Sequence, residues 1–234
     1  FERYLKETCG LARNTAAKYL ECFRKVLKVA QHKGWMEDGR CLEELGRLCV
    51  KEETFPSFLD WDELRTVMET DMPAGRLERV KDVFVFCALT GLSYQGISTL
   101  CPSHLFRDDE GTLWICRTRA EGAEVGDSCT SRVPLLKPAM VLLEKYRGWN
   151  PMNPEGPCFP VPSVQKMNEY LKEVSVLCRI SKRLTTQMAR NTFAATVTLA
   201  NRIPKEHVGE MLGYSSDYML RHYTQALERN SQKA

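Results

Sequence analysis

The spacing of apolar and polar positions predicts a chain built mainly from helices. After Asn14, which we expect to be a helix N-cap, apolar residues recur every three or four positions, the period of one helix face. These apolar positions are Ala16, Leu20, Phe23, Leu27 and Ala30. Gly34, which follows Lys33, is a typical helix stop.

The same period recurs along the rest of the chain and predicts further helices. Asp60 and Glu63, three residues apart, form a capping-box pattern at the start of one of them. The expected helices are 41–50, 61–69, 77–90, 93–100, 137–147, 163–179, 186–200, 204–212 and a piece near 216–227. Alternating patterns predict only two strands, 112–118 and 129–135, joined as a hairpin. The fold class is therefore mainly α with a small β-hairpin or sheet (α+β).

Residues 53–57 have the composition of a linker and divide the chain into two domains, 1–52 and 58–234. The proline-rich stretch 151–162 contains five of the eleven prolines. We interpret this stretch as a surface connection, not a second linker, because helical patterning resumes directly after it.

Composition narrows the class of protein. The chain has 234 residues, of which 43% are hydrophobic and 27% charged, and this balance excludes global disorder. No apolar run approaches the roughly 18–20 residues of a membrane span, so no membrane association is expected. The N-terminus lacks both a signal-peptide pattern and an initiator Met, so we expect a fragment or a processed product.

The ten cysteines predict reduced thiols. No two of them are closer than eight residues, which excludes paired zinc ligands. A disulfide framework is the alternative, but thiols inside apolar helical stretches are typical of the reducing cytoplasm. We expect a cytoplasmic protein with no metal and no cofactor.

The positive charge of the chain is concentrated in two groups of basic residues. The net charge of +3 neither demands nor excludes nucleic acid. The stretch 182–205 has five basic residues and no acidic one: Lys182, Arg183, Arg190, Arg202 and Lys205. A second basic face lies beside the apolar face of the first helix and comprises Lys18, Arg24, Lys25 and Lys28. We predict that both faces contact DNA phosphates, and a solvated helix surface is the alternative.

A group of polar residues in the last third suits phosphodiester chemistry. Gln187 and Arg190 are three residues apart and share a helix face. With the hydroxyl of Tyr223 they would supply a charge clamp, a polar partner and a nucleophile. Packing residues are the alternative interpretation.

Five motifs follow one another in a characteristic order. They are Thr-Gly-Leu at 90–92, Arg-Val-Pro-Leu-Leu at 132–136, Thr-Gln-Met-Ala-Arg-Asn-Thr-Phe-Ala at 186–194, Leu-Gly-Tyr at 212–214 and His-Tyr at 222–223. In this order they resemble the tyrosine recombinase (phage integrase) family, most closely mobile-element integrases of the Bacteroides type. The resemblance covers nearly the whole chain. It implies that 1–52 is part of a helical, SAM-like core-binding domain and that 58–234 is a tyrosine recombinase catalytic domain.

The resemblance also implies six catalytic positions. Tyr223 matches the nucleophile, which the family places on an accessible segment outside the core, and Tyr218 is the alternative. Arg190 matches the second arginine. Four positions depart from the family: Gln187 replaces a His, Tyr214 a His or Trp, Ser93 the first arginine, and Arg119 the hairpin lysine, with Glu121 as an alternative alignment.

These departures weaken the chemistry of the site. The loss of one charge clamp on a phosphate costs about 10²–10³ in rate. Arg119 would keep the charge of a lysine but transfer a proton poorly. Other cations close in sequence could fill in: Arg117, Arg183, Arg221 and His222.

The implied function is a site-specific DNA recombinase or integrase that binds double-stranded DNA and self-associates on it as a tetramer. Tyr223 would form a 3′-phosphotyrosyl intermediate and release a 5′-hydroxyl, without ATP or metal. The first alternative is a catalytically degenerate relative that binds DNA as an accessory or regulatory factor. A second alternative is a helical protein-interaction module.

Overall fold

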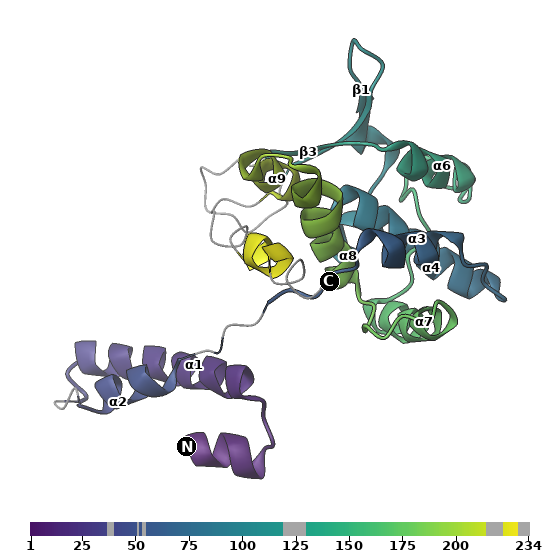
Figure 1. The fold of residues 1–234 in the computed structure, drawn as a ribbon. Helices are drawn as coiled ribbons and strands as arrows, with labels where there is room; N and C mark the ends of the chain where they lie inside the picture. Colours follow the sequence, from purple (N-terminus) through teal and green to yellow (C-terminus); the bar gives the residue numbers. More distant parts are fainter. Residues whose placement is uncertain (37–39, 51, 53–54, 119–129, 214–221, 229–234) are drawn as a thin grey trace. The chain divides into compact units, whose positions relative to one another are not determined.

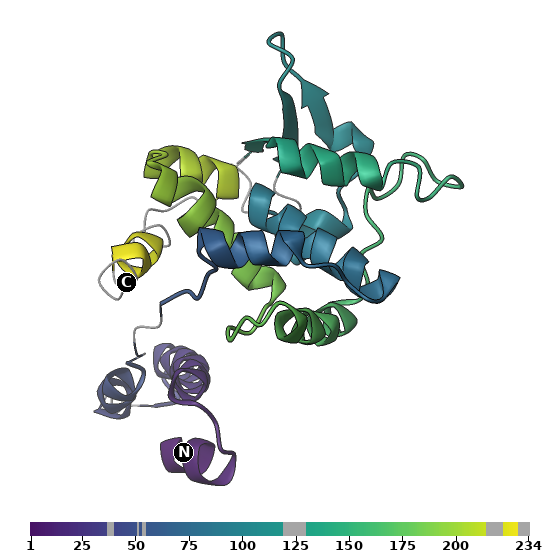
Figure 2. The ribbon, with the colours of Figure 1, turned by 45° about the vertical axis from the view of Figure 1, so that its right-hand side comes forward.

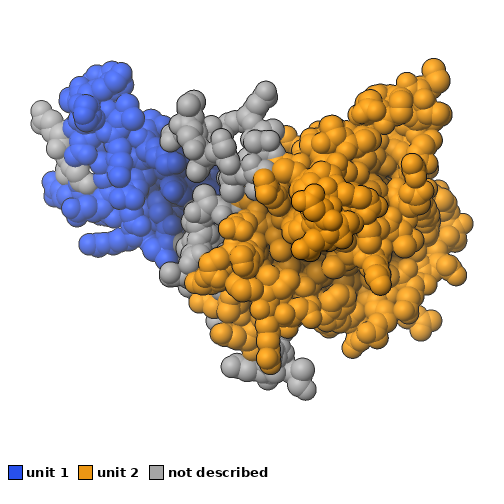
Figure 3. Space-filling model, turned by 90° about the horizontal axis from the view of Figure 1, so that it is seen from above, with its two compact units in different colours: residues 1–54 blue, residues 55–234 orange. Residues whose placement is uncertain are grey.

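The computed structural model describes residues 1–36, 40–50, 52, 55–118, 130–213 and 222–228. The chain forms two compact units, Phe1–Thr54 and Phe55–Ala234 (Figure 3). Within the described ranges, no helix has both the length and the apolarity that a membrane span needs. The assignment of 1–52, 53–57 and 58–234 as a core-binding domain, a linker and a catalytic domain stays a prediction.

The first unit packs around the helix α1 (Arg13–His32), with the π-helical η1 (Tyr4–Thr8) and α2 (Arg40–Leu48) against it. Its small core is made of Leu5, Ala16, Leu20 and Leu45. The expected N-cap at Asn14 is wrong, because Ala12 takes that place. The Asn14 carboxamide instead bonds both backbone groups of Glu52, accepting from its N–H at 2.8 Å and donating to its carbonyl at 3.1 Å.

The buried helix α4 (Gly75–Thr90) is the centre of the second unit, and every residue from Val80 to Thr90 is buried. Among the helices that it packs against are α3 (Trp61–Glu69), α6 (Lys137–Lys145), α7 (Val164–Leu177) and α8 (Thr186–Thr192). α4 and α8 lie between the sheet at one end of the unit and α7 at the other (Figures 1 and 2). The predicted capping box of Asp60 and Glu63 is confirmed at the start of α3.

A three-stranded antiparallel sheet has the order β1 (Leu105–Arg107), β2 (Leu113–Thr118) and β3 (Thr130–Pro134). The predicted pairing of the last two strands is confirmed, with Ile115 opposite Val133 and Arg117 opposite Ser131. β1 contradicts the prediction of only two strands. Its three residues are too few for a period-2 pattern to register.

The predicted helix 186–200 is three pieces: α8, the π-helical η3 (Phe193–Thr198) and the 3-10 turn η4 (Leu199–Asn201). Threonine hydroxyls bond carbonyls four residues back, from Thr192 to Met188 at 2.9 Å and from Thr198 to Ala194 at 2.7 Å. Such bonds bend helices, and π turns accommodate the bend.

Shorter elements complete the second unit. They are α5 (Tyr94–Ser98), η2 (Pro102–His104), α9 (Lys205–Leu212) and a helical stretch over 222–228. The first residues of the helix expected near 216–227 lie outside the described part of the chain, as far as residue 221.

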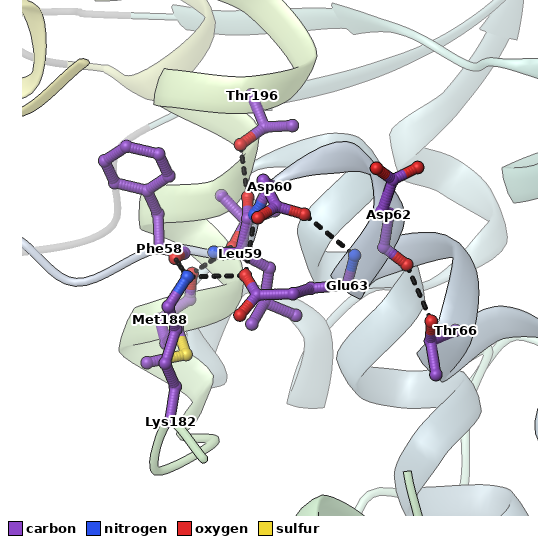
Figure 4. Close-up of polar contacts among 10 residues, drawn as sticks. Phe58, Leu59, Asp60, Asp62, Glu63, Thr66, Lys182, Met188 and Thr196 are labelled. Carbon is purple, nitrogen blue, oxygen red and sulfur yellow. Dashed lines mark hydrogen bonds and ion pairs between the residues drawn. The ribbon is translucent and has the colours of Figure 1, made fainter. Parts of the chain in front are cut away.

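The segment before α3 is fastened to α8 and η3. The Leu59 N–H donates to the Thr192 hydroxyl at 3.0 Å, and the Thr196 hydroxyl donates to the Leu59 carbonyl. Lys182 donates to the Phe58 carbonyl at 3.1 Å and pairs with Glu63, as Figure 4 shows. These bonds fix α8, which carries the candidate catalytic residues, to the start of the unit.

Candidate active site

Arg190 joins two helix ends. From α8, its guanidinium donates to the carbonyl of Gly91, just past the end of α4, and to the carbonyl of Leu212, the last residue of α9. Gly91 and Gly213 are the left-handed C-caps of these two helices, with φ of 71° and 64°. Arg190 is half-buried. A guanidinium held by two carbonyls in this way has a defined direction.

Asn191, directly after Arg190, connects Gln187 with Tyr223. Its side-chain oxygen accepts from the Gln187 amide and from the Tyr223 hydroxyl, each at 3.0 Å. Its side-chain nitrogen donates to the Ser57 carbonyl at 2.9 Å. One buried carboxamide therefore holds two of the predicted catalytic residues and the start of the unit.

Tyr223 is buried, and the expectation of an accessible segment is wrong in this structure. Its side chain is 1% exposed and belongs to the main hydrophobic core. Burial of a phenol is favourable when its hydroxyl has a hydrogen-bond partner, and Asn191 provides one.

Ser93 has a structural role at the start of α5. It is the N-cap of α5, and its hydroxyl accepts from the Gly96 N–H at 3.1 Å. Arg117 also contacts α5, through the Gly96 carbonyl and the Thr99 hydroxyl.

The structure therefore links Gln187 and Tyr223 through Asn191, the residue that follows Arg190 on α8. Ser93 lies two residues after Gly91, whose carbonyl Arg190 contacts. Several other predicted residues lie outside the described ranges: Arg119, Tyr214, Glu121, Tyr218 and Arg221. Asn191 is a site residue that the sequence reasoning missed. Its signal was its position in the Gln-Met-Ala-Arg-Asn-Thr motif.

The predicted DNA-contacting residues differ in their surroundings. Lys18, Lys25 and Lys28 are exposed on α1, whereas Arg24 lies over α2, where a side-chain carbon at Gly46 would come within 3.5 Å of its guanidinium. In the second unit Arg183 and Arg202 are exposed. Lys182 is already engaged, because its ammonium lies 2.5 Å from the Glu63 carboxylate.

The described residues contain no group of three or more His, Cys, Asp and Glu side chains arranged to hold a metal ion. All nine cysteines in the described ranges are free thiols. Cys87, in the core beside Arg190, has a pKa that burial raises to about 12, against the opposing influence of the Arg190 charge. This thiol is therefore protonated at neutral pH and packs as an apolar side chain.

Comparison with known proteins gives one match to a family model and several matches to solved structures. Residues 1–41 match the family model of the phage integrase SAM-like domain. No curated protein matches the chain by sequence.

Among solved structures, the chain is similar to XerA recombinase, with 15% identity, a TM-score of 0.58 and coverage of 99% of this chain and 80% of the other. It is similar to the Tn1549 transposon integrase in complex with circular intermediate DNA, with 14% identity, a TM-score of 0.67 and coverage of 97% and 81%. A lambda integrase dimer bound to a core site is also similar, with 14% identity, a TM-score of 0.64 and coverage of 90% and 73%.

The match to XerH site-specific recombinase spans only 52% of that chain's length. The Bacteroides-type resemblance stays a prediction. The mainly helical architecture with its three-stranded sheet, the structural matches and the N-terminal family match agree with one another. The chain thus has the fold of the tyrosine recombinases, and it begins with a segment of the phage integrase SAM-like type.

Proposed function

We propose that the chain is a site-specific DNA recombinase or integrase that cleaves and rejoins DNA through a covalent tyrosyl intermediate. The observation that carries the proposal is the pairing of Gln187 and Tyr223 through Asn191, directly after Arg190 on α8, in a tyrosine recombinase fold. A nucleophile, a fixed guanidinium and a polar amide are the parts that phosphoryl transfer needs.

The reaction is a pair of transesterifications. The Tyr223 oxygen attacks a DNA phosphorus, a 3′-phosphotyrosyl bond forms, and the 5′-oxygen of the next nucleotide leaves and takes up a proton. The 5′-hydroxyl of a partner strand then attacks the same phosphorus and releases Tyr223. The energy of the broken phosphodiester stays in the covalent intermediate, so the exchange needs no ATP.

Each remaining residue has a proposed role. Arg190 stabilises the charge that develops on the phosphate, and Gln187 donates a hydrogen bond from its amide. Tyr214 and Arg119 are proposed as a hydrogen-bond donor and a cation at the positions that the family resemblance assigns to them.

The proposed partner is double-stranded DNA, and the proposed active assembly is a tetramer on DNA. Similar structures support the first part, since they include XerH bound to its difH substrate and a lambda integrase dimer on a core site. The basic residues Lys18, Lys25, Lys28, Arg183 and Arg202 would contact phosphates, because all five are exposed.

The test is capture of the covalent intermediate. The parent chain and Tyr223→Phe are incubated with a pool of nicked duplexes of random sequence, in which the nick lets the cleaved strand diffuse away and traps the protein on DNA. The parent is expected to give a protein–DNA adduct that survives a denaturing gel, and Tyr223→Phe none. Tyr146→Phe is the control, because it also removes a buried tyrosine hydroxyl bond, to Asp82.

A second candidate function is that of a catalytically degenerate DNA-binding relative. It is favoured by Ser93, whose hydroxyl caps a helix where the family has an arginine, and by the burial of Tyr223. DNA binding in a native gel with no adduct from the parent chain would support this function over the first.

A further inference from the structure

We propose that Arg117 is a catalytic residue that supplies the second guanidinium of the site, in place of the arginine missing at Ser93. The inference rests on the proposed function. It assigns to Arg117 a direct contact with the phosphate that Tyr223 attacks.

The register of the sheet directs Arg117 toward the body of the protein. Alternate residues of a strand share a face, so Arg117 lies on the same face of β2 as Ile115, which is 1% exposed and packs in the core. Its cross-strand partner Ser131 lies on that face too. The Ser131 hydroxyl reaches the Met211 carbonyl at the end of α9.

Arg117 and its cross-strand partner Ser131 reach the two parts of the fold that Arg190 joins. Arg190 donates to the Gly91 carbonyl before Ser93, and Arg117 donates to the Gly96 carbonyl after it. At the end of α9, Arg190 donates to the Leu212 carbonyl, and Ser131 bonds the neighbouring Met211 carbonyl. The two arginines therefore contact the segment that carries Ser93 at two points, one before Ser93 and one after it.

The charge of Arg117 has no anionic partner in the described part of the chain. It is half-buried, and its hydrogen bonds there go to the Gly96 carbonyl and, at 2.8 Å, to the Thr99 hydroxyl. A guanidinium has five N–H donors, so donors remain for a ligand.

Burial lowers the pKa of Arg117, which reports the cost of desolvating its charge. A bound phosphate would offset that cost with charge-assisted hydrogen bonds.

The position of Arg117 explains how the site can tolerate Ser93. A transition state with charge on its equatorial oxygens requires donors fixed before the reaction, and a side chain from any element can provide them. Arg117 is fixed by two bonds to α5, the helix that the missing arginine would have preceded. In this arrangement Arg117 on β2 supplies the positive charge, and Ser93 serves only as the N-cap of α5.

The test compares Arg117→Gln with Arg132→Gln by the rate of adduct formation per DNA-bound complex, on the nicked duplexes described above. Arg132 is the matched control, because it lies on β3 opposite Cys116, is exposed, and faces the other side of the sheet. Arg117→Gln is expected to lower the rate by about 10²–10³ and Arg132→Gln to leave it unchanged. Arg117→Lys keeps the charge, and its rate is expected to fall between those of the parent and Arg117→Gln.

A double variant separates a catalytic role from a structural one. Ser93→Arg added to Arg117→Gln places a guanidinium back at the helix start and is expected to restore part of the lost rate. If Arg117 had only a structural role, an arginine at position 93 could not take it over. A double variant with a rate as low as that of Arg117→Gln therefore counts against the proposal. Equal rates for Arg117→Gln and Arg132→Gln overturn it.

A second readout keeps the inference separate from the proposed function. Inorganic phosphate is expected to raise the melting temperature of the parent and of Arg132→Gln, but not that of Arg117→Gln. If Arg117→Gln fails to fold, Arg117→Lys replaces it, and phosphate is expected to raise its melting temperature by less than that of the parent. If the parent forms no adduct, the proposed recombinase activity fails, and the phosphate shifts alone decide the role of Arg117. Equal shifts in all variants overturn the inference.

Discussion

At the scale of single residues, Asn191 holds the hydroxyl of Tyr223, the proposed nucleophile. Its carboxamide oxygen takes hydrogen bonds from Gln187 and Tyr223 at once, and its nitrogen bonds the Ser57 carbonyl. A tyrosine held in this way is stable in the core but turned away from solvent. In the proposed reaction, release of Tyr223 for attack has to break its buried bond to Asn191, and the free energy of that bond contributes to how often the nucleophile is available.

Asn191→Ala is expected to destabilise the protein by about 1–3 kcal/mol, because it removes the hydrogen bonds of the Asn191 carboxamide with the Tyr223 hydroxyl and the Ser57 carbonyl. Urea unfolding measures the change. Gln187→Ala is the control, because the Gln187 side chain is exposed and its loss should cost no more than about 0.5 kcal/mol. An equal decrease in the free energy of unfolding for the two variants would mean that the hydrogen bonds of Asn191 do not contribute to stability.

The sequence could propose site residues but not their surroundings. Motif order selected Gln187, Arg190 and Tyr223, and the structure links Gln187 and Tyr223 through Asn191. It could not show that Tyr223 is buried, because burial depends on contacts with Asn191 and the core. Nor could it show that Lys182 pairs with Glu63, because 119 residues separate them along the chain.

At the scale of elements, the junction between α4 and α5 is shaped by Gly91. This glycine has φ of 71°, and a side-chain carbon there would lie 2.5 Å from Phe193 and 2.9 Å from Leu212. The close approach brings α4, η3 and α9 together around the Gly91 carbonyl that Arg190 contacts.

Gly91→Ala is expected to destabilise the protein strongly, because about 1–2 kcal/mol of left-handed strain adds to about 1–3 kcal/mol of overpacking. Gly111→Ala is the matched control, with φ of 84° and no atom within 4 Å of the added carbon. Thermal unfolding measures the loss of stability in both variants. Because both carry the left-handed strain, the difference between the two losses is the cost of overpacking at position 91. A difference near zero would show that η3 and α9 yield without cost.

The contact of α4 with α6 predicts a pH dependence. Burial tends to raise the pKa of Glu78, but hydrogen bonds from Lys145 and Lys81 outweigh it and hold that pKa below its usual value. Burial tends to lower the pKa of Lys145, but Asp82 and Glu78 outweigh it and raise that pKa. The carboxylate stabilises the fold above its ordinary pKa of about 4.3, and the ammonium does so below its ordinary pKa of about 10.4.

Stability from these groups is therefore lost as the pH falls through the lowered pKa of Glu78, and again as it rises through the raised pKa of Lys145. Calorimetry of Glu78→Gln between acid and neutral pH should show a smaller fall in melting temperature on acidification than the parent shows. Glu144→Gln, on an exposed part of α6, should follow the parent. An equal fall in melting temperature on acidification for the parent, Glu78→Gln and Glu144→Gln would mean that the Glu78 carboxylate does not contribute to the pH dependence.

Secondary structure was predictable where a local signal exists. The capping box of α3 and the hairpin pairing of β2 and β3 follow from short patterns. The three-residue β1 has too few positions for a pattern. The π turn of η3 accompanies threonine bonds to carbonyls four residues back, which the period of the apolar positions does not reveal. The N-cap expected at Asn14 failed because Glu52 competes for its carboxamide.

At the scale of the whole molecule, DNA binding should be mainly electrostatic, although the chain has a net charge of only +3. The positive charge is gathered on the exposed lysines of α1 and in the basic stretch 182–205. Each phosphate neutralised by a basic side chain contributes about −0.9 to the slope of log affinity against log salt concentration. We therefore expect a clearly negative slope, and a slope near zero would contradict phosphate contacts altogether.

The α1 face can be tested by removing its exposed lysines together. A triple variant with Lys18→Gln, Lys25→Gln and Lys28→Gln should make the slope less negative by up to about 2.7, at about 0.9 for each lost phosphate contact. The matched control neutralises three other exposed lysines, Lys137, Lys166 and Lys172, for which no DNA contact is predicted. Both variants change the net charge equally, so a general effect of charge alters both slopes alike, whereas a specific α1 face alters only the first. Equal slopes for the two variants would mean that α1 does not contact DNA and that binding depends on the second unit alone.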